Sequence, residues 1–247
     1  DIEKASGPVF LGLDVGSTTI KAVVTDENDE IIYSYYGKNE GSPITRGISI
    51  LKDLYSKLPE GAFIANACTT GYGELLLKKA FRINEGEIET IAHYKAANHF
   101  SPNVDFIIDI GGQDSKVISL TPDGKMANFV MNDKCAAGTG RFLDVMAQIL
   151  QIDINDMGKY AADADEVVRI SNTCTVFAES EVISQMAAGV RMENLIAGIC
   201  ESVGAKVSTL ARRVGAKEMV CLSGGVARNS AVRKSLEKNL GVTIQCS

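Results

Sequence analysis

Two short motifs of one form place an aspartate and a glycine where a phosphate group could bind. Both read Asp-[Val/Ile]-Gly-x4-Lys, one from Asp14 to Lys21 and the other from Asp109 to Lys116. A glycine lets the backbone approach a phosphate, and successive N–H groups form a concavity that binds anions. An Asp at the end of each preceding strand could hold Mg²⁺ through water, because Mg²⁺ keeps most of its hydration shell. We therefore assign Asp14 and Asp109 to a magnesium–nucleotide site.

A third glycine turn, residues 223–229, lies between a predicted strand and a predicted helix, where nucleotide ligands commonly bind. Gly224, Gly225 and Asn229 could contact the adenosine or its α-phosphate. Each Gly pair alone is also compatible with a simple tight turn, but three such turns, two with a strand-ending Asp, favour a nucleotide site. The sequence has no Gly-x4-Gly-Lys-[Ser/Thr] motif, which excludes a P-loop protein.

Several further side chains could serve the same nucleotide. The residues assigned to its phosphates are Gly16, Ser17, Thr18, Thr19, Lys21, Gly111, Gly112 and Gln113. Gln113 or Asp114 could orient a water toward the γ-phosphate, and a solvated loop position is the alternative for Gln113. Lys21 and Lys116 could neutralise phosphates, although outward-facing strand lysines fit the pattern equally well.

Strands and helices must position these residues, and the chain contains a repeat that does so. At an offset of 95 residues the Asp-Gly motif recurs, and the turn at residues 26–30 falls on residues 121–125. Apolar β-rich runs predict strands over residues 9–14, 20–25, 31–36, 62–67, 104–109, 117–120, 126–131 and 218–222. Helical spacing predicts helices over residues 45–57, 72–80, 140–150, 175–188, 195–214 and 230–240. The repeat predicts a duplicated three-strand meander, one in each lobe, with a nucleotide held by both.

The composition excludes several classes of protein. Apolar residues are 45% and charged residues 23%, as in globular proteins, and 25 basic against 31 acidic residues leave a net charge of −6 without a Lys/Arg block. A general nucleic-acid binder is therefore not expected. The longest stretch free of formal charge, residues 61–73, is far shorter than the ~20 apolar residues of a spanning helix. No signal peptide is recognisable, so we expect a cytoplasmic protein with reduced thiols.

The glycine motifs resemble the two phosphate motifs and the adenosine motif of the acetate and sugar kinase/Hsc70/actin superfamily. Residues 132–146 and 171–184, which contain Cys135 and Cys174, are similar to one branch. That branch comprises the ATP-dependent activators of 2-hydroxyacyl-CoA dehydratases, related to the ATPase subunits of benzoyl-CoA reductase. The resemblance covers essentially the whole chain. It implies an α/β, two-lobed actin/Hsc70-like (ribonuclease H-like) duplicated ATPase fold.

The resemblance also implies the lobes and more of the nucleotide site. The first lobe would cover residues 1–100 and the second residues 101–247. Gly138, Thr139 and Gly140 of the first cysteine segment would belong to the nucleotide site. Members of the family continue into a last helix that returns to the first lobe, so we expect that the end at Ser247 is trimmed.

The cysteines separate into two groups. Cys135 and Cys174 both lie close to predicted helix N-termini, the latter after the good N-cap types Ser171, Asn172 and Thr173. The partial positive charge there favours a thiolate. A 4Fe–4S cluster needs four thiolates, and a two-fold dimer of this chain would supply them. The resemblance implies the same: one cluster bridging a homodimer, bound by Cys135 and Cys174 of each subunit, with buried structural cysteines as the alternative.

The remaining cysteines carry no clear chemistry. Cys200 on an apolar helix face and Cys221 in a buried strand are expected to fill the core. Cys246 is nearly terminal, and Cys68 precedes a glycine-rich loop without a motif of its own. No Cys-x-x-Cys is present, which excludes zinc ribbons and thioredoxin motifs.

The function implied by the resemblance is ATP-driven electron transfer. Mg-ATP hydrolysis to ADP would accompany transfer of one electron from a ferredoxin or flavodoxin, through the cluster, to an iron–sulfur acceptor such as a 2-hydroxyacyl-CoA dehydratase. A shift of ~300 mV for one electron corresponds to ~7 kcal/mol, which passive docking does not readily supply. The acceptor could instead be a double-cubane or benzoyl-CoA reductase-like protein. Alternatives from other classes are a small-molecule kinase, which leaves the cysteine segments unexplained, and a nucleotide sensor. An exposed bridging cluster implies oxygen sensitivity and an anaerobic setting.

Overall fold

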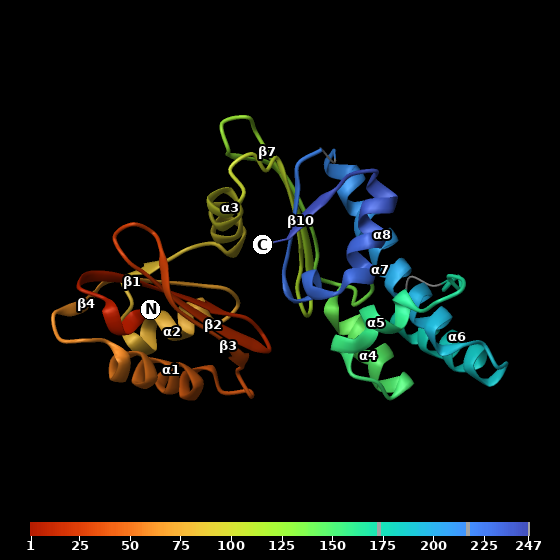
Figure 1. The fold of residues 1–247 in the computed structure, drawn as a ribbon, viewed down its shortest axis with the longest axis horizontal. Coiled ribbons are helices and arrows are strands. Elements are labelled where there is room, and N and C mark those ends of the chain that lie inside the picture. The colour runs from red at the N-terminus through yellow and green to blue at the C-terminus, as the bar shows by residue number, and fades with distance from the viewer. Residues whose placement is uncertain (172–173, 216–217, 247) are drawn as a thin grey trace. The chain divides into compact units, whose positions relative to one another are not determined.

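The computed structural model describes residues 1–171, 174–215 and 218–246. The chain divides into two compact units, Asp1–His93 and Tyr94–Ser247 (Figure 1). The division falls inside helix α3 (Glu89–Phe100), and the lobes expected from the sequence, residues 1–100 and 101–247, stay a prediction. Among the described residues, no helix is both long and apolar enough to cross a membrane.

The first unit is a five-stranded sheet in the order β3-β2-β1-β4-β5 with helices packed on it. Its elements are β1 (Gly7–Val15), β2 (Thr19–Thr25), β3 (Ile31–Lys38), α1 (Pro43–Lys57), β4 (Ala62–Thr70), α2 (Glu74–Phe81) and β5 (Glu85–Gly86), after a 3-10 turn at Ile2–Lys4. Strands β1, β2 and β3 run antiparallel, and β1 and β4 run parallel. Alternate residues of β1 are buried against Ile50, Leu54 and Leu77 of the two helices, as expected for a strand with one face on the core.

The second unit repeats this sheet and adds more helices. Its strand order is β10-β9-β6-β7-β8. Its elements are β6 (Phe106–Ile110), β7 (Ser115–Leu120), β8 (Met126–Asn132), α4 (Gly140–Leu150), α5 (Met157–Ala162), α6 (Thr175–Ala187), α7 (Met192–Val214), β9 (Val220–Ser223), α8 (Ser230–Leu240) and β10 (Ile244–Cys246), with 3-10 turns at Ile154–Asp156 and Gly225–Arg228. Every residue of β6 and β7 is buried, because α7 packs on one face and Ala97 of α3 on the other.

The predicted duplication is confirmed residue by residue. Asp14 pairs with Lys21 across β1 and β2, and Asp109 pairs with Lys116 across β6 and β7. The two hairpin turns close alike, since the N–H of their first residue donates to the carbonyl of their fifth at 3.1 Å in the first unit and 2.7 Å in the second. Within these turns Asp29 has a φ of 61° and Gly124 a φ of 74°. Both residue types tolerate this left-handed conformation, so one turn geometry occurs at equivalent positions.

One helix starts earlier than predicted, and several elements were not predicted. Helix α1 begins at Pro43, two residues before the predicted start, and Pro is favourable in the first turn because its missing N–H is not needed there. Helices α3 and α5 were not predicted. Helix α3 lacks a clear apolar stripe, and α5 has only six residues. Strands β5 and β10, of two and three residues, are too short to leave a pattern.

Candidate functional site

The first Asp-Gly motif forms a tight turn at the end of β1. The Lys21 Nζ lies 2.6 Å from Asp14 Oδ2, so the lysine pairs with the strand-ending carboxylate. The Gly16 N–H donates to the Thr19 carbonyl at 2.9 Å and closes the turn. Ser17 and Thr18 are exposed at its tip, so their hydroxyls and backbone groups are accessible to an anion.

Asn39 holds this first turn, and the sequence analysis missed it. Its Nδ2 donates to the carbonyls of Gly16 at 3.0 Å and Ser17 at 3.1 Å, and its own N–H donates to the Thr18 carbonyl. Asn39 is only 5% exposed. Because β3 pairs antiparallel with β2, the residue after β3 must lie beside the residues before β2. That topological argument was the available signal for an asparagine at this position.

The second Asp-Gly motif forms the equivalent turn in a drier setting. Asp109 is 2% exposed and Lys116 is 3% exposed. The Lys116 Nζ lies 3.0 Å from an Asp114 carboxylate oxygen and 3.8 Å from Asp109 Oδ2, and Ser223 Oγ donates to Asp109 Oδ1 at 2.9 Å. A buried charge requires such partners. The interpretation of Lys116 as an outward-facing strand lysine is therefore wrong, because both faces of β7 are covered.

A glycine lies against the strand-ending carboxylate in each unit. Gly224, after β9, has a φ of +87°, and a Cβ there would lie 2.3 Å from the Ile110 carbonyl oxygen and 2.9 Å from Asp109 Oδ1. Gly71, after β4, has a φ of +88°, and a Cβ there would lie 2.6 Å from Asp14 Oδ1. Only glycine satisfies both the conformation and the close approach. Gly224 was predicted from its motif, whereas Gly71 was not.

The second turn is joined to the N-terminus of helix α4. The Gly140 N–H donates to the Gly111 carbonyl at 2.8 Å, and the Arg141 N–H donates to the Gly112 carbonyl at 2.7 Å. A Cβ on Gly140 would lie 3.1 Å from the Gly111 oxygen. Of the predicted residues 138–140, the structure thus brings Gly140 to the second Asp-Gly turn. Gly138, in contrast, lies against Lys206 of α7, and the buried Thr139 donates its hydroxyl to the Ala136 carbonyl.

The other predicted nucleotide residues have varied surroundings. Gln113 is exposed at the tip of the second turn. Gly225 starts the 3-10 turn Gly225–Arg228 directly after Gly224. Asn229 caps helix α8, since its Oδ1 accepts from the N–H groups of Ala231 at 3.0 Å and Val232 at 3.1 Å. Helix capping accounts for Asn229, and its contact with a nucleotide stays a prediction.

The two cysteines singled out by the sequence both lie in the second unit and differ in exposure. Cys174 is exposed at the N-cap position of α6, where its carbonyl accepts from the Ala178 N–H at 3.0 Å. Cys135 is partly buried in the loop before α4. Asn132, the last residue of β8, donates from Nδ2 to the carbonyls of Cys135 at 2.9 Å and Ala137 at 3.0 Å, so one amide fixes this loop. The predicted cap residues Asn172 and Thr173 lie outside the described residues.

The core cysteines behave as the sequence predicted. Cys200 is 1% exposed and Cys221 is fully buried. Burial raises the pKa of the Cys200 thiol to about 12, which opposes thiolate chemistry there. Cys68 lies partly buried on β4. Cys200 and Cys221 are thus confirmed as core residues.

The donors on each unit fit the groups that the sequence implies. A 4Fe–4S cluster takes thiolates, and this chain presents the exposed Cys174 at a helix N-cap and the partly buried Cys135 in the loop before α4, half of a four-thiolate set. Asp14 and Asp109 offer the oxygen ligands that Mg²⁺ prefers. A Cβ on Gly111 would lie 2.7 Å from Asp114 Oδ1, and one on Gly16 would lie 3.3 Å from the Thr19 carbonyl oxygen, so each turn folds tightly over its own glycine.

Comparison with known proteins places this geometry in context. The sequence model of the BadF/BadG/BcrA/BcrD ATPase family matches residues 11–247. An (R)-2-hydroxyglutaryl-CoA dehydratase activating ATPase of Acidaminococcus fermentans is 44% identical over 240 residues, which span 96% of this chain and 90% of that protein. The structure of the activator of the 2-hydroxyisocaproyl-CoA dehydratase from Clostridium difficile with bound ADPNP is 39% identical. It covers 97% of this chain and 88% of that chain with a TM-score of 0.89.

More distant structures show the fold alone. A ROK family glucokinase from Streptomyces griseus in complex with glucose and AMPPNP is 15% identical, covers 96% of this chain and 94% of that chain, and has a TM-score of 0.58. The two sheets of like strand order, together with this neighbour, confirm the predicted actin/Hsc70-like duplicated α/β fold.

Proposed function

The chain belongs to the BadF/BadG/BcrA/BcrD ATPase family, and from this membership we propose that it is an ATP-hydrolysing activator that delivers a low-potential electron to an iron–sulfur enzyme of the 2-hydroxyacyl-CoA dehydratase type. The names of its relatives, a dehydratase activating ATPase and a dehydratase activator, support this acceptor class. The alternative acceptor for the same activity is a double-cubane or benzoyl-CoA reductase-like protein.

Mg-ATP would use the residues that each unit sets around its Asp-Gly turn. In the first unit, the exposed backbone and hydroxyls of Ser17 and Thr18 would bind phosphate oxygens. In the second unit, Gly111 and Gly112 would do so, with Gly224 close to the Asp109 carboxylate. Asp14 and Asp109 would hold the hydrated Mg²⁺. Asp114 is engaged by Lys116, so the exposed Gln113 is the better candidate to orient the hydrolytic water.

One observation carries the coupling between nucleotide and electron transfer. The carbonyls of Gly111 and Gly112 accept hydrogen bonds from the first N–H groups of α4. The loop that leads into α4 contains Cys135 and is fixed by Asn132. A change in the second turn on ATP binding or hydrolysis would therefore move α4 and the Cys135 loop together.

The thiols of Cys135 and Cys174 would bind half of the cluster. Cys135 and Cys174 of one chain would be matched by the same residues of a second copy, so that a homodimer holds one 4Fe–4S cluster. When bound, this cluster would supply a one-electron store. A ferredoxin or flavodoxin is the expected donor, and the helix N-terminus at Cys174 would stabilise the negative charge of its thiolate.

Anaerobic reconstitution tests the proposal. The protein, incubated with iron and sulfide, should show the optical and EPR spectra of a 4Fe–4S cluster and about two iron atoms per chain. Replacing Cys135 or Cys174 with Ser should abolish the spectra, while Cys68→Ser is the matched control that should keep them. A reconstituted wild type without a cluster refutes the proposal. Phosphorylation of a sugar or carboxylic acid by the cluster-free protein would instead support a kinase.

A further inference from the structure

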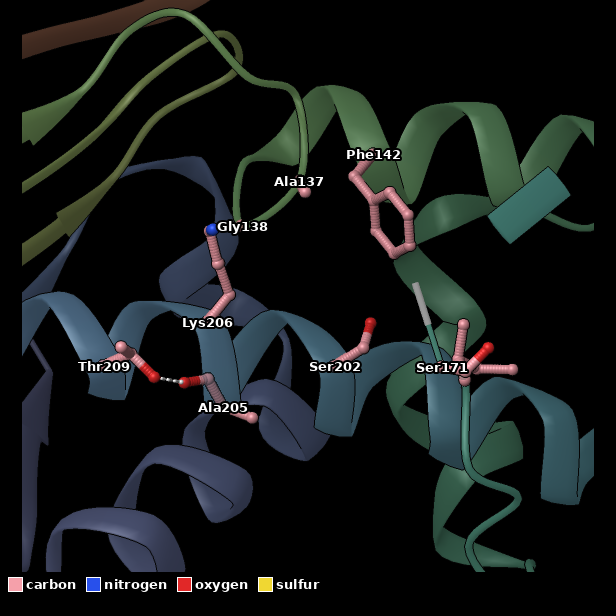
Figure 2. Close-up of a pocket in the computed structure, with 9 residues that line it drawn as sticks. Ala137, Gly138, Phe142, Ser171, Ser202, Ala205, Lys206 and Thr209 are labelled. Atoms are coloured by element: carbon pink, nitrogen blue, oxygen red, sulfur yellow. Dashed lines mark hydrogen bonds between the residues drawn. The ribbon is translucent and has the colours of Figure 1, made fainter. Parts of the chain in front are cut away.

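The second unit contains a cavity of about 290 Å³ that the proposed function does not use. Figure 2 shows the side chains around it. Its lining residues are Ala137, Gly138, Phe142, Ile170, Ser171, Ser202, Ala205, Lys206 and Thr209. They come from the Cys135 loop, from the start of α4, from the segment before Cys174 and from one face of α7. The cavity therefore touches both cysteine-bearing segments.

Lys206 supplies a positive charge on one wall. Its side chain rises from α7 toward Gly138 (Figure 2), and a Cβ on Gly138 would lie 2.9 Å from Lys206 Cγ. In the part of the chain that the structure describes, no ion pair involves Lys206. Lys206 is half-buried as a residue, and its ammonium group favours an anionic partner. The cavity should therefore select a ligand with a negative charge at this end.

The three hydroxyl groups that line the cavity each donate a hydrogen bond to an oxygen of the protein. Ser202 Oγ donates to the Ile199 carbonyl at 2.8 Å, and Thr209 Oγ1 donates to the Ala205 carbonyl at 2.9 Å. Ser171 Oγ donates to Glu181 Oε2 at 2.8 Å. Each hydroxyl keeps lone pairs that can accept. A matching ligand should therefore bring a hydrogen-bond donor of its own to these oxygens.

The rest of the lining is apolar and carries no second cation. Phe142, Ile170, Ala137 and Ala205 form this part of the wall. A phosphate dianion would leave one negative charge without a partner. A monoanion with a short hydrocarbon body fits better, because its apolar atoms can contact these side chains.

We propose that this cavity binds a small hydroxycarboxylate, whose carboxylate pairs with Lys206 and whose hydroxyl donates to the serine or threonine oxygens. The site is built entirely from the second unit. Binding requires neither nucleotide nor cluster, so the proposal does not depend on the proposed function.

Calorimetric titration of the intact protein tests the site with four probes: 2-hydroxybutyrate, 3-hydroxybutyrate, butyrate and inorganic phosphate. We expect saturable binding of at least one hydroxybutyrate, one molecule per chain. Butyrate should bind at least ~3-fold more weakly because it lacks the donor, and phosphate should not bind measurably. The absence of saturable hydroxybutyrate binding up to ~10 mM, or equal binding of butyrate, overturns the proposal.

Three variants locate the binding within the cavity. Lys206→Met keeps the side-chain bulk and should weaken hydroxybutyrate binding by ~10-fold or more, because it removes the charge. Ala205→Leu should fill the cavity and abolish binding, and it carries the test if the first variant does not fold. Lys234→Met, at an exposed position of α8 outside the cavity, is the matched control and should bind as the wild type. Unchanged affinity in both cavity variants refutes the site.

Discussion

The two Asp-Gly turns are built alike but held by different means. In the first unit, the side-chain amide of Asn39 donates to the carbonyls of Gly16 and Ser17. In the second unit, the equivalent carbonyls, those of Gly111 and Gly112, accept from the N-terminal N–H groups of helix α4. One residue next to β3 thus closes the first turn locally. The second turn is closed by a helix whose preceding loop contains a cysteine.

The two turns therefore differ in the group that satisfies the equivalent pair of carbonyls: a side-chain amide in the first unit and a helix N-terminus in the second. A helix N-terminus has N–H groups without partners in the helix, and a tight turn has carbonyls that need donors. The second unit satisfies both needs with the same hydrogen bonds, so the turn and the start of α4 are joined directly. In the first unit, the Gly73 N–H at the N-cap of α2 donates instead to the Val15 carbonyl at 2.9 Å, one residue before the two carbonyls that Asn39 holds. The second unit is therefore the one in which an Asp-Gly turn is joined through a helix N-terminus to the loop that contains Cys135.

The glycines that press on the strand-ending aspartates should give the largest effect. Gly71→Ala and Gly224→Ala each force a Cβ against backbone and carboxylate oxygens at a positive φ. We expect each to lower the free energy of unfolding by about 3 kcal/mol. Urea denaturation measures the change. A large loss in only one variant would break the equivalence of the two units. Gly189→Ala, at a positive φ with open space around it, is the control for the conformational term alone.

Asn39→Ala should weaken the first turn without touching the cysteines. The substitution leaves the Gly16 and Ser17 carbonyls without their donor in a nearly buried place. We expect a loss of about 2 kcal/mol in the free energy of unfolding and weaker ATP binding, measured by calorimetry. The iron content after reconstitution should stay at the wild-type value. A lower iron content would show that the first turn is connected to the cluster site after all.

Asn132→Ala should have the converse effect. It removes the two hydrogen bonds that fix the Cys135 loop, at a cost of about 1–2 kcal/mol because the residue is only partly buried. Reconstituted iron should fall, or the cluster EPR signal should change, while ATP affinity stays close to that of the wild type. Asn132→Gln tests for partial rescue. Wild-type cluster spectra in the alanine variant would remove Asn132 from this role.

The hairpin turns offer the smallest and most local comparison. The Asp26 carboxylate accepts the N–H groups of Asn28 and then Glu30, which lowers the pKa of Asp26 below its usual value. A lowered folded-state pKa stabilises the fold above the unfolded pKa of ~3.9, and the stabilisation is lost as the pH falls through the folded value. The equivalent residue Thr121 accepts the Lys125 N–H without a charge.

Asp26→Asn should therefore flatten the acid limb of the stability curve slightly, whereas Thr121→Ser should leave it unchanged. Denaturation between neutral pH and pH ~3 measures both variants. An acid limb identical to that of the wild type in Asp26→Asn would contradict the assignment.

The sequence predicted those features of the fold that leave a repeating pattern. The meander was readable twice, because the motif and the turn chemistry of residues 26–30 recur at a fixed offset. The burial of Lys116 was not readable, since it depends on packing from α3, a helix without a clear apolar stripe. The roles of Asn39 and Asn132 were not predicted for a related reason. Each is a single amide just beyond or at a strand end, and its partners are fixed only once the sheet has formed.

The site was predictable in part for the same reason. A glycine in a tight turn and an aspartate at the end of a strand can be recognised from the local sequence, so Gly111 and Asp109 were found directly. The choice of Cys135 and Cys174 over Cys68 rested on the predicted helix starts and on the resemblance of whole segments, because the exposure of a thiol is a tertiary property. Gly71, the counterpart of Gly224, follows a strand that the sequence analysis ended before residue 70. The boundary error hid the equivalence.

The most direct test of the account is the EPR spectrum of the reduced, reconstituted protein before and after addition of Mg-ATP. The hydrogen bonds from Gly140 and Arg141 join the second turn, the proposed phosphate site, to α4 and the Cys135 loop. The account predicts that Mg-ATP changes the line shape of the cluster signal. Superimposable spectra, recorded at a concentration of ATP that saturates the protein, would contradict it.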